Sequence, residues 1–166
     1  MFATLAFMVS GCSGDEQKRE YAVPRELCGT PISSADLTPF LPPGEKISVR
    51  DDSHSSGRGC EVIVDEKLVV STTQAWLEKG KTTAYFAAGQ TLDAPDGSSD
   101  DGRFRYSGNE AFGKTRGCVD QKHGQELYTA VQAEASKHED RAAMKRLIVS
   151  YTKEVEESAE CTAGSQ

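Results

Sequence analysis

Cys12 is the residue whose surroundings most clearly specify a chemistry. It ends the sequence Val9-Ser10-Gly11-Cys12, in which an aliphatic and two small residues precede a cysteine, and it follows the apolar residues 2–9. This pattern is typical of a lipobox, where small side chains admit the precursor to the processing enzyme and the cysteine sulfur takes a diacylglycerol through a thioether. Two acyl chains give stable membrane anchoring. We therefore expect residues 1–11 to be a lipoprotein signal peptide and Cys12 to be the lipidated N-terminus.

The alternative is that residues 2–9 form a short buried segment of a cytosolic protein. The run is too short to span a bilayer, but its length fits the apolar region of a signal peptide. No basic residue precedes Lys18, whereas signal peptides begin with a positively charged segment. We therefore expect the signal peptide to be truncated or to have a misassigned start.

The other cysteines point to disulfide bonds. The chain has five cysteines, and removing Cys12 leaves Cys28, Cys60, Cys118 and Cys161. Four cysteines allow three pairings. We prefer nearest-neighbour pairing, because it closes two independent loops, each stabilising by about 3–4 kcal/mol on the chain-entropy model. A zinc site is disfavoured because no two cysteines are spaced as CxxC and no histidine pair has finger spacing.

Charge and length limit the classes of partner and the number of domains. The formal net charge is −7, which argues against nucleic acid as a partner, because phosphate binding needs a basic face. It also argues against adhesion to anionic lipid by charge alone. The mature chain is long enough for one core. We expect a lipidated, flexible tether at residues 12–20, one domain at 21–161 and a loose tail at 162–166.

The residue patterns predict an α+β fold, with an antiparallel sheet packed against a long C-terminal helix and one or two short helices. Strands are expected at residues 46–50, 60–64, 67–77, 103–106, 111–118 and 126–136, and short helices at 34–41 and 83–88. Asp65-Glu66 suits a hairpin turn, and residues 51–59 and 91–102 have loop composition. In the last strand we expect one core face, made of Leu127, Thr129, Val131, Ala133 and Ala135.

The long helix is predicted from two signals. Ser136 and Glu139 form a capping-box pattern. Apolar residues then recur at spacings of three and four from Met144 to Ala159. We therefore expect a helix from this cap to Glu160.

No catalytic signature stands out. The sequence has no GxSxG elbow, HExxH motif, phosphate loop or GxGxxG motif. The histidines, His54, His123 and His138, have polar neighbours, and we expect His54 to be solvated. The acidic residues 91–102 do not match EF-hand spacing, so a solvated loop is favoured over calcium. We assign no catalytic residue, no metal and no cofactor.

Aromatic and basic side chains mark where a ligand could bind. Trp76 is most simply a core or sheet-end anchor, with ligand stacking as the alternative. Residues 103–106 and 111–118 form the one locally basic stretch, either an ordinary solvated strand face or a surface for anionic glycan or lipid headgroups. The candidate ligand-binding residues are Trp76, Tyr85, Arg103, Phe104 and Arg105.

Several segments carry a resemblance to a known group of proteins. They are the lipobox, Cys28 before a short helix, Gly59-Cys60-Glu61-Val62, Trp76-Leu77-Glu78-Lys79-Gly80, Asp101-Gly102-Arg103-Phe104-Arg105-Tyr106-Ser107-Gly108 and Ala143-Met144-Lys145-Arg146-Leu147-Ile148. Across nearly the whole mature chain, the sequence resembles small actinobacterial lipoproteins of unknown function. More distantly, the order of elements with two disulfides resembles the extracytoplasmic sensor domains of some bacterial receptor kinases. The resemblance implies an α+β sandwich with an antiparallel sheet, and it supplies no catalytic residues.

These observations lead to an expectation about function. We expect a non-catalytic domain that is anchored to the cell membrane through diacylglycerol on Cys12, faces the extracytoplasmic side, and binds a ligand or partner in the cell envelope. One alternative is an accessory subunit of an envelope protein complex. The other is an envelope hydrolase, because the members of a catalytic triad come together only in the fold.

Overall fold

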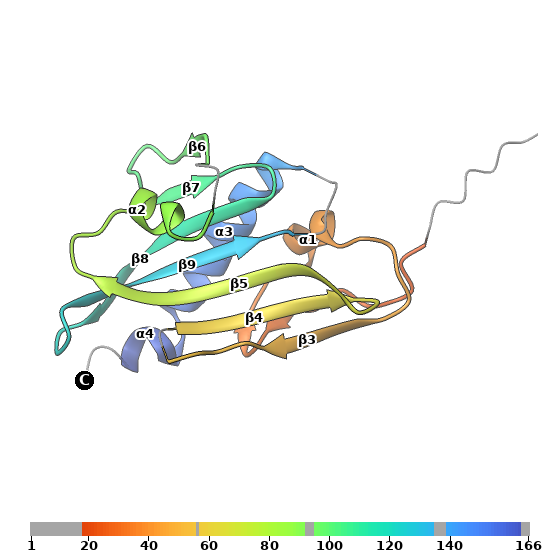
Figure 1. Ribbon diagram of the computed structural model, residues 1–166, viewed down its shortest axis with the longest axis horizontal. Coiled ribbons are helices and arrows are strands. Elements are labelled where there is room, and N and C mark those ends of the chain that lie inside the picture. Colours follow the sequence, from red (N-terminus) through yellow and green to blue (C-terminus); the bar gives the residue numbers. More distant parts are fainter. Residues whose placement is uncertain (1–17, 56, 92–94, 135–138, 164–166) are drawn as a thin grey trace, which may run out of the picture.

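The computed structural model describes residues 18–55, 57–91, 95–134 and 139–163. Within them, a seven-stranded antiparallel sheet has the strand order β3-β4-β5-β9-β8-β7-β6, with helices on both sides (Figure 1). Its strands are β3 (Ile47–Asp51), β4 (Gly57–Val64), β5 (Lys67–Glu78), β6 (Gly97–Ser98), β7 (Phe104–Tyr106), β8 (Glu110–Asp120) and β9 (Gln125–Gln132). A small second sheet pairs β1 (Glu26–Leu27) with β2 (Thr30–Pro31). The helices are α1 (Ser34–Leu37), the 3₁₀ turn η1 (Thr38–Phe40), α2 (Thr83–Ala88), α3 (Arg141–Glu156) and α4 (Ala159–Ala163). The predicted α+β class is confirmed.

Helix α3 covers one face of the sheet, here called the inner face. The helix buries seven side chains, which are Ala143, Met144, Leu147, Ile148, Tyr151, Thr152 and Val155. They recur at the spacings of three and four that place residues on one side of a helix. All of them except Thr152 pack with Leu37 and Phe40 of α1 and η1, and with Leu127 and Val131 of β9, into the main core. The inner face thus holds most of the buried apolar surface.

The opposite, outer face is covered only in part. Helix α2 lies across it, in front of the sheet in Figure 1. Phe86 of α2 packs edge-on against Phe112 of β8, with ring centroids 5.9 Å apart, and against Tyr128 of β9 at 5.5 Å. Ala87 and Ala130 complete this second cluster. Strands β8 and β9 are therefore buried on both faces where α2 crosses them.

Several local features follow the sequence closely. Asp65 and Glu66 adopt φ values of 45° and 68°, which a two-residue hairpin turn requires. The Asp65 carboxylate accepts hydrogen bonds from the backbone amides of Glu45 and Lys46. Ser33 caps α1 by accepting from the Asp36 amide at 3.2 Å. The hairpin and the short capped helix appear where the sequence predicts them.

The start and end of the long helix differ from the prediction. Asp140, not Ser136, caps α3, because its Oδ1 accepts a hydrogen bond of 2.8 Å from the Ala143 amide. Ser136 lies outside the described residues. The helix ends at Glu156, and α4 begins separately at Ala159. The break redirects the chain so that Cys161 meets Cys118 of β8.

Three further expectations need correction. In β9 the predicted face, Leu127, Thr129, Val131 and Ala133, is buried, but Tyr128 and Ala130 on the opposite face are buried as well, because α2 covers them. Ala135 lies outside the described residues. The loop expected at residues 51–59 is shorter, since β3 reaches Asp51 and β4 begins at Gly57. The loop at 91–102 contains β6, which pairs with β7.

The folded part extends beyond the expected limits at both ends. Arg19 donates to the carbonyls of Thr38 and Leu41, the second bond measuring 2.5 Å, and the Glu20 amide donates to the Gly44 carbonyl at 2.8 Å. These residues were assigned to the tether, but their contacts belong to the domain. At the other end, Thr162, assigned to the tail, lies in α4. Lipobox residues 9–12 lie outside the described residues.

Two disulfides join Cys28 to Cys60 and Cys118 to Cys161. This is the nearest-neighbour pairing preferred from the sequence. The first ties the turn between β1 and β2 to β4, and the second ties β8 to α4. Disulfides persist in oxidising compartments, so the two bonds indicate an extracellular or otherwise oxidising location. Among the described residues, no helix combines the length and apolar character needed to cross a membrane.

Candidate functional site

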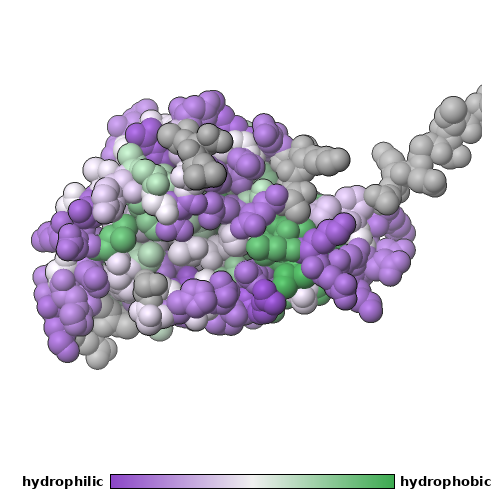
Figure 2. All heavy atoms as spheres, in the orientation of Figure 1, coloured by the Kyte–Doolittle hydropathy of each residue, from purple (hydrophilic) through white to green (hydrophobic). Residues whose placement is uncertain are grey.

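A hollow lies on the outer face of the sheet. It has a volume of about 800 Å³ and runs over β4 and β5, between α2 and the loop that joins β3 to β4. We call it the outer groove. Apolar side chains gather in two places along this face, separated by polar ones (Figure 2). Pockets for small molecules commonly measure about 300–1,000 Å³ and combine apolar walls with a few polar groups.

The floor of the outer groove exists because small side chains alternate along β5. Ser71, Thr73 and Ala75 project to the outer face, while Thr72 and Gln74 between them project to the inner face and meet Tyr151. Successive residues of a strand point to opposite faces. The short outer side chains leave the hollow unfilled.

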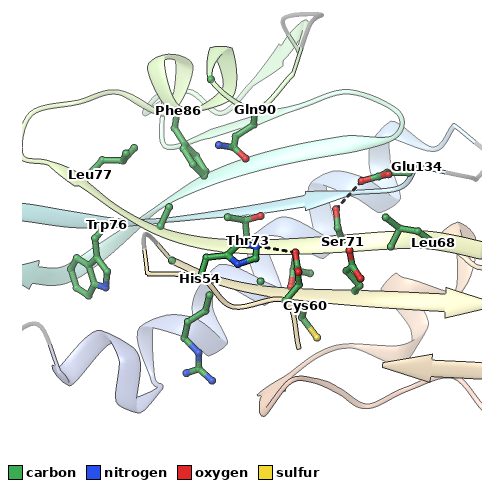
Figure 3. A pocket seen from close by; sticks show the side chains of 18 of the residues that line it. His54, Cys60, Leu68, Ser71, Thr73, Trp76, Leu77, Phe86, Gln90 and Glu134 are labelled. Atoms are coloured by element: carbon green, nitrogen blue, oxygen red, sulfur yellow. Dashed lines mark hydrogen bonds and ion pairs between the residues drawn. The ribbon is translucent and has the colours of Figure 1, made fainter. Parts of the chain in front are cut away.

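The walls come from α2 and from the loop before β4. Phe86 and Gln90 extend from the α2 side toward the hollow (Figure 3). His54 lies on the opposite rim, where its Nε2 is 3.4 Å from the Asp52 carboxylate. Gly59 lies near the start of β4, packed against this loop. A Cβ on Gly59 would lie 2.6 Å from the Asp52 carbonyl oxygen. Glycine is therefore required for the loop to turn this tightly beside β4.

The far end of the groove carries a carboxylate. Glu134, just after β9, accepts a hydrogen bond of 3.2 Å from the Ser71 hydroxyl (Figure 3). No cationic side chain among the described residues forms an ion pair with Glu134, whereas Glu61 nearby is paired with Arg50. The groove therefore offers apolar surface, hydroxyl groups and an acidic rim.

The structure separates the candidate ligand-binding residues into three places. Trp76 and Tyr85 both line the outer groove. Arg103 and Arg105 line a second hollow of about 600 Å³ on the other side of α2. Phe104 is only 7% exposed and belongs to the main core, so it is unavailable to a ligand. The sequence placed these five residues in one group because it could not show that α2 lies between the two hollows.

Trp76 acts mainly as an anchor. Its indole Nε1 donates to Glu160 of α4 at 3.0 Å, and the ring packs against the main core. Figure 3 shows the ring directed away from the hollow, on the side of β5 opposite α2. Tyr85 is 56% exposed, but one face of its ring is occupied by the Lys81 ammonium, 4.4 Å from the ring centroid. Neither aromatic ring offers a fully open stacking surface.

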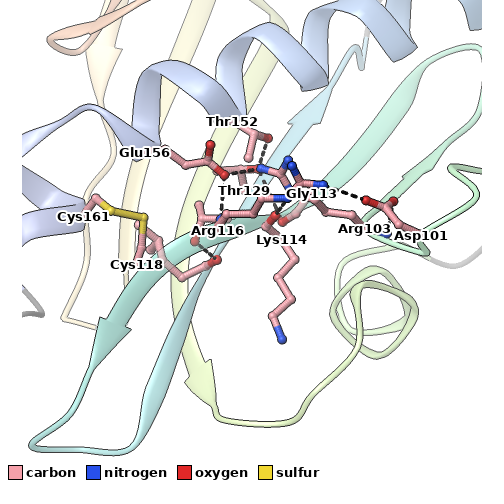
Figure 4. A network of polar contacts seen from close by, with 12 residues as sticks. Asp101, Arg103, Gly113, Lys114, Arg116, Cys118, Thr129, Thr152, Glu156 and Cys161 are labelled. Atoms are coloured by element: carbon pink, nitrogen blue, oxygen red, sulfur yellow. Dashed lines mark hydrogen bonds and ion pairs between the residues drawn. A yellow bond between two sulfur atoms is a disulfide. The ribbon is translucent and has the colours of Figure 1, made fainter.

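A network of polar contacts holds β7, β8 and α3 together (Figure 4). Arg103 donates from Nε to the Lys114 carbonyl at 2.7 Å and forms an ion pair with Glu156 of α3. The same Glu156 carboxylate accepts from the Arg116 amide at 2.6 Å. Deeper in the core, the Thr129 and Thr152 hydroxyls lie 2.7 Å apart. Arg103 is therefore a structural cation whose partner lies on α3.

Lys114 and Glu126 form a second fixed pair, on the outer face. Lys114 Nζ lies 2.7 Å from a carboxylate oxygen of Glu126, which also accepts from the Gly80 amide at 3.0 Å. Burial disfavours the charge on Lys114, but hydrogen bonds to Glu126 and Tyr128 outweigh it and raise the pKa of Lys114. The Lys114 hydrogen bond holds the pKa of Glu126 below its ordinary value. Both groups are charged at neutral pH.

Ionisable groups elsewhere in the described residues form isolated pairs. His123 Nδ1 lies 2.6 Å from Asp120 on the exposed turn between β8 and β9. The described residues hold no group of three or more His, Cys, Asp or Glu side chains placed to bind a metal ion. His138 and Asp93 lie outside the described residues. In the described part of the chain, no serine or threonine hydroxyl is hydrogen-bonded to His54 or His123.

Sequence reasoning missed most of the groove. Ser71, Thr73, Gln90 and Glu134 were not proposed as site residues, although all line it. One usable signal was present, since every second residue of β5 from Ser71 through Thr73 to Ala75 is small. Small side chains on an outer face leave room that a covering element, a ligand or water can fill.

Comparison with protein families, with curated proteins and with solved structures found no match to this chain.

Proposed function

We propose that this protein is a lipid-anchored domain of the cell envelope that binds a small ligand in the outer groove without transforming it. The observation that carries the proposal is the groove itself, about 800 Å³ in volume, with an apolar and hydroxyl-bearing floor and an acidic rim. Its floor belongs to the central strands of a disulfide-linked sheet. Binding sites on such rigid elements lose little entropy when a ligand is bound.

The lipid anchor is the second part of the proposal. It is supported by the sequence Val9-Ser10-Gly11-Cys12, and the two disulfides agree with an oxidising compartment. A Cys12→Ser variant expressed with a working signal sequence is expected to leave the membrane fraction, because the thioether to diacylglycerol cannot form. Continued membrane association of this variant would refute the anchor and leave the groove proposal standing.

Ligand binding is tested by filling the groove. In the full 166-residue chain carrying Cys12→Ser, Thr73→Tyr places an aromatic ring on the groove floor. Ser48→Tyr is the matched control, because Ser48 faces the same side of the sheet on edge strand β3 but does not line the groove. The probe is N-phenyl-1-naphthylamine, an uncharged apolar fluorophore.

We expect the fluorophore to brighten with the parent chain and with Ser48→Tyr, and to lose most of that signal with Thr73→Tyr. Equal signals from all three proteins would contradict binding in the groove. Native mass spectrometry of the parent chain, purified gently from a secreting host, supplies the second readout. A reproducible extra mass that is absent from Thr73→Tyr would identify the natural ligand class.

A further inference from the structure

The second hollow on the outer face combines an unusual set of charges. It is lined by five cationic side chains and by a single carboxylate, Asp101; the cations are Lys81, Arg103, Arg105, Lys114 and Arg116. The chain as a whole carries a net charge of −7. We call this hollow the basic cleft. Cations thus gather locally in a protein that is acidic overall.

Two of the carboxylates that hold these cations in place lie outside the cleft, whereas Asp101, the partner of Arg116, lines it. Glu156 pairs with Arg103 from α3, and Glu126 pairs with Lys114 from β9, yet neither residue lines the cleft. Figure 4 shows the Lys114 side chain extending away from α3, whereas the Arg103 side chain turns toward that helix. These pairs fix the positions of two cations before a ligand arrives, which lowers the entropic cost of binding.

Arg105 differs from the other four cations of the basic cleft. Its guanidinium forms no hydrogen bond or ion pair with any side chain in the described part of the chain, although Arg103, Lys114, Arg116 and Lys81 each have a carboxylate partner. Arg105 is opposite Phe112 in the β7–β8 ladder, so it is a diagonal neighbour of Lys114 on the outer face. Diagonal neighbours in an antiparallel pair lie about 7–8 Å apart, a span that one multi-oxygen anion can bridge.

We propose that the basic cleft binds an oxyanion, a phosphate or polyphosphate group, through Arg105 and Lys114 with Lys81 and Arg116 at its rim. Arginine binds such groups with two parallel N–H···O bonds, and lysine binds them as a point charge. The hydroxyl groups of Thr82 and Ser98 supply further donors around the same hollow. This proposal does not depend on binding in the outer groove, from which α2 separates the cleft.

The position of the cleft favours an anion in solution or on a polymer over a membrane headgroup. The first described segment, coloured red in Figure 1, lies at the right-hand end of the molecule, whereas α2 and β7 lie toward the left. The proposed anchor would therefore attach to the domain at the end remote from the cleft. Free and membrane-bound anions share the same oxyanion chemistry, so the experiment must separate them.

The test titrates the full chain carrying Cys12→Ser with inorganic tripolyphosphate at about 50 mM salt. Calorimetry measures the binding affinity. Arg105→Gln is expected to weaken binding by about tenfold or more, the usual effect of losing a charge-assisted contact. Lys122→Gln is the control, because it removes the same charge from the exposed β8–β9 turn. Arg105→Lys should bind with intermediate affinity.

Two results would overturn the proposal. One is equal affinity of Arg105→Gln and the parent chain, including the absence of binding by either. The other is equal weakening by Lys122→Gln, which would show a general charge effect. A second titration with vesicles of phosphatidylglycerol, compared with phosphatidylcholine, separates the sources. Binding to the anionic vesicles alone, lost in Arg105→Gln, would keep the oxyanion site but overturn the assignment to a free anion.

Discussion

The hydroxyl of Tyr151, in α3, lies 3.1 Å from the side-chain amide nitrogen of Gln74, in β5. Tyr151 also donates to the Thr72 hydroxyl at 3.2 Å, and Gln74 donates to the Thr30 hydroxyl at 3.2 Å. All four residues are buried, and burial raises the pKa of Tyr151. Helix, central strand and small sheet thus meet at one polar cluster inside the apolar core.

Removing the Tyr151 hydroxyl should weaken this junction. Tyr151→Phe leaves the buried Gln74 amide and Thr72 hydroxyl without their shared partner, and we expect a loss of about 1–3 kcal/mol in the free energy of unfolding. Tyr85→Phe is the control, because Tyr85 is exposed. Urea unfolding of both variants checks the prediction. A loss that is no larger in Tyr151→Phe than in Tyr85→Phe would contradict it.

The Cys118–Cys161 disulfide should control the environment of the single tryptophan. Replacing both cysteines with alanine releases α4 from β8, so that Glu160 no longer holds the Trp76 indole. We expect red-shifted tryptophan emission and a loss of roughly 4 kcal/mol in stability, from the loop-entropy relation and the 43-residue separation. The matched variant, Cys28→Ala with Cys60→Ala, should lose similar stability but keep its emission maximum in the folded state. An emission shift of equal size in both variants would contradict the role of the Cys118–Cys161 disulfide in holding Glu160 against Trp76.

The free energy of unfolding should depend on pH through the Glu126 carboxyl. The folded-state pKa of this carboxyl is lowered, chiefly by its hydrogen bond from Lys114. A carboxyl with a depressed pKa stabilises the fold above its unfolded-state pKa of about 4.3, and this stabilisation is lost as pH falls through the lower folded-state value. We expect Glu126→Gln to be less stable than the parent at pH 7, with the difference shrinking below about pH 4.

The control for Glu126 is Glu26→Gln, which changes an exposed carboxylate in β1. Unfolding free energies of the three proteins, measured between neutral and acidic pH, give the comparison. A difference between Glu126→Gln and the parent that stays constant with pH would mean that lost packing, and not the ion pair, causes the destabilisation.

Gly113 should not tolerate a side chain. A Cβ there would lie 2.6 Å from the Thr152 hydroxyl oxygen and 2.8 Å from that of Thr129, so β8 or α3 would have to shift. We expect Gly113→Ala to cost about 1–3 kcal/mol, as overpacking in a core commonly does. Gly89→Ala, whose nearest neighbour would be 3.5 Å away, should be close to neutral. Thermal unfolding of the two variants, each compared with the parent chain, tests this prediction.

Much of the fold was predictable because its signals are local. The spacing of apolar residues in α3 and the Asp65-Glu66 turn each depend on a few neighbouring residues. The order of cysteines favoured the pairing that the structure shows. The cap of α3 was misplaced by four residues because Asp140 and Ser136 both carry good capping side chains, and only the fold determines which of them the chain uses.

The candidate site was harder to predict because it depends on where α2 packs. Nothing within residues 83–88 specifies that Phe86 inserts against Phe112 and Tyr128. That contact determines which part of the outer face stays open. Arg103 is a similar case, since its role as a structural cation depends on Glu156, a partner distant in sequence. A local pattern can indicate exposure but cannot indicate such partners.

The position of β5 beside β9 also has a consequence for the order of folding. The chain completes β3, β4 and β5 early, but the other edge of β5 must wait for β9, which follows β6, β7 and β8. Each disulfide closes within one half of the chain, so neither brings β5 to β9. During synthesis or export, the twelve-residue β5 therefore exposes an unpaired edge, which can template aggregation until the non-local ladder forms. Docking of β9 onto β5 is therefore expected to limit the rate of folding.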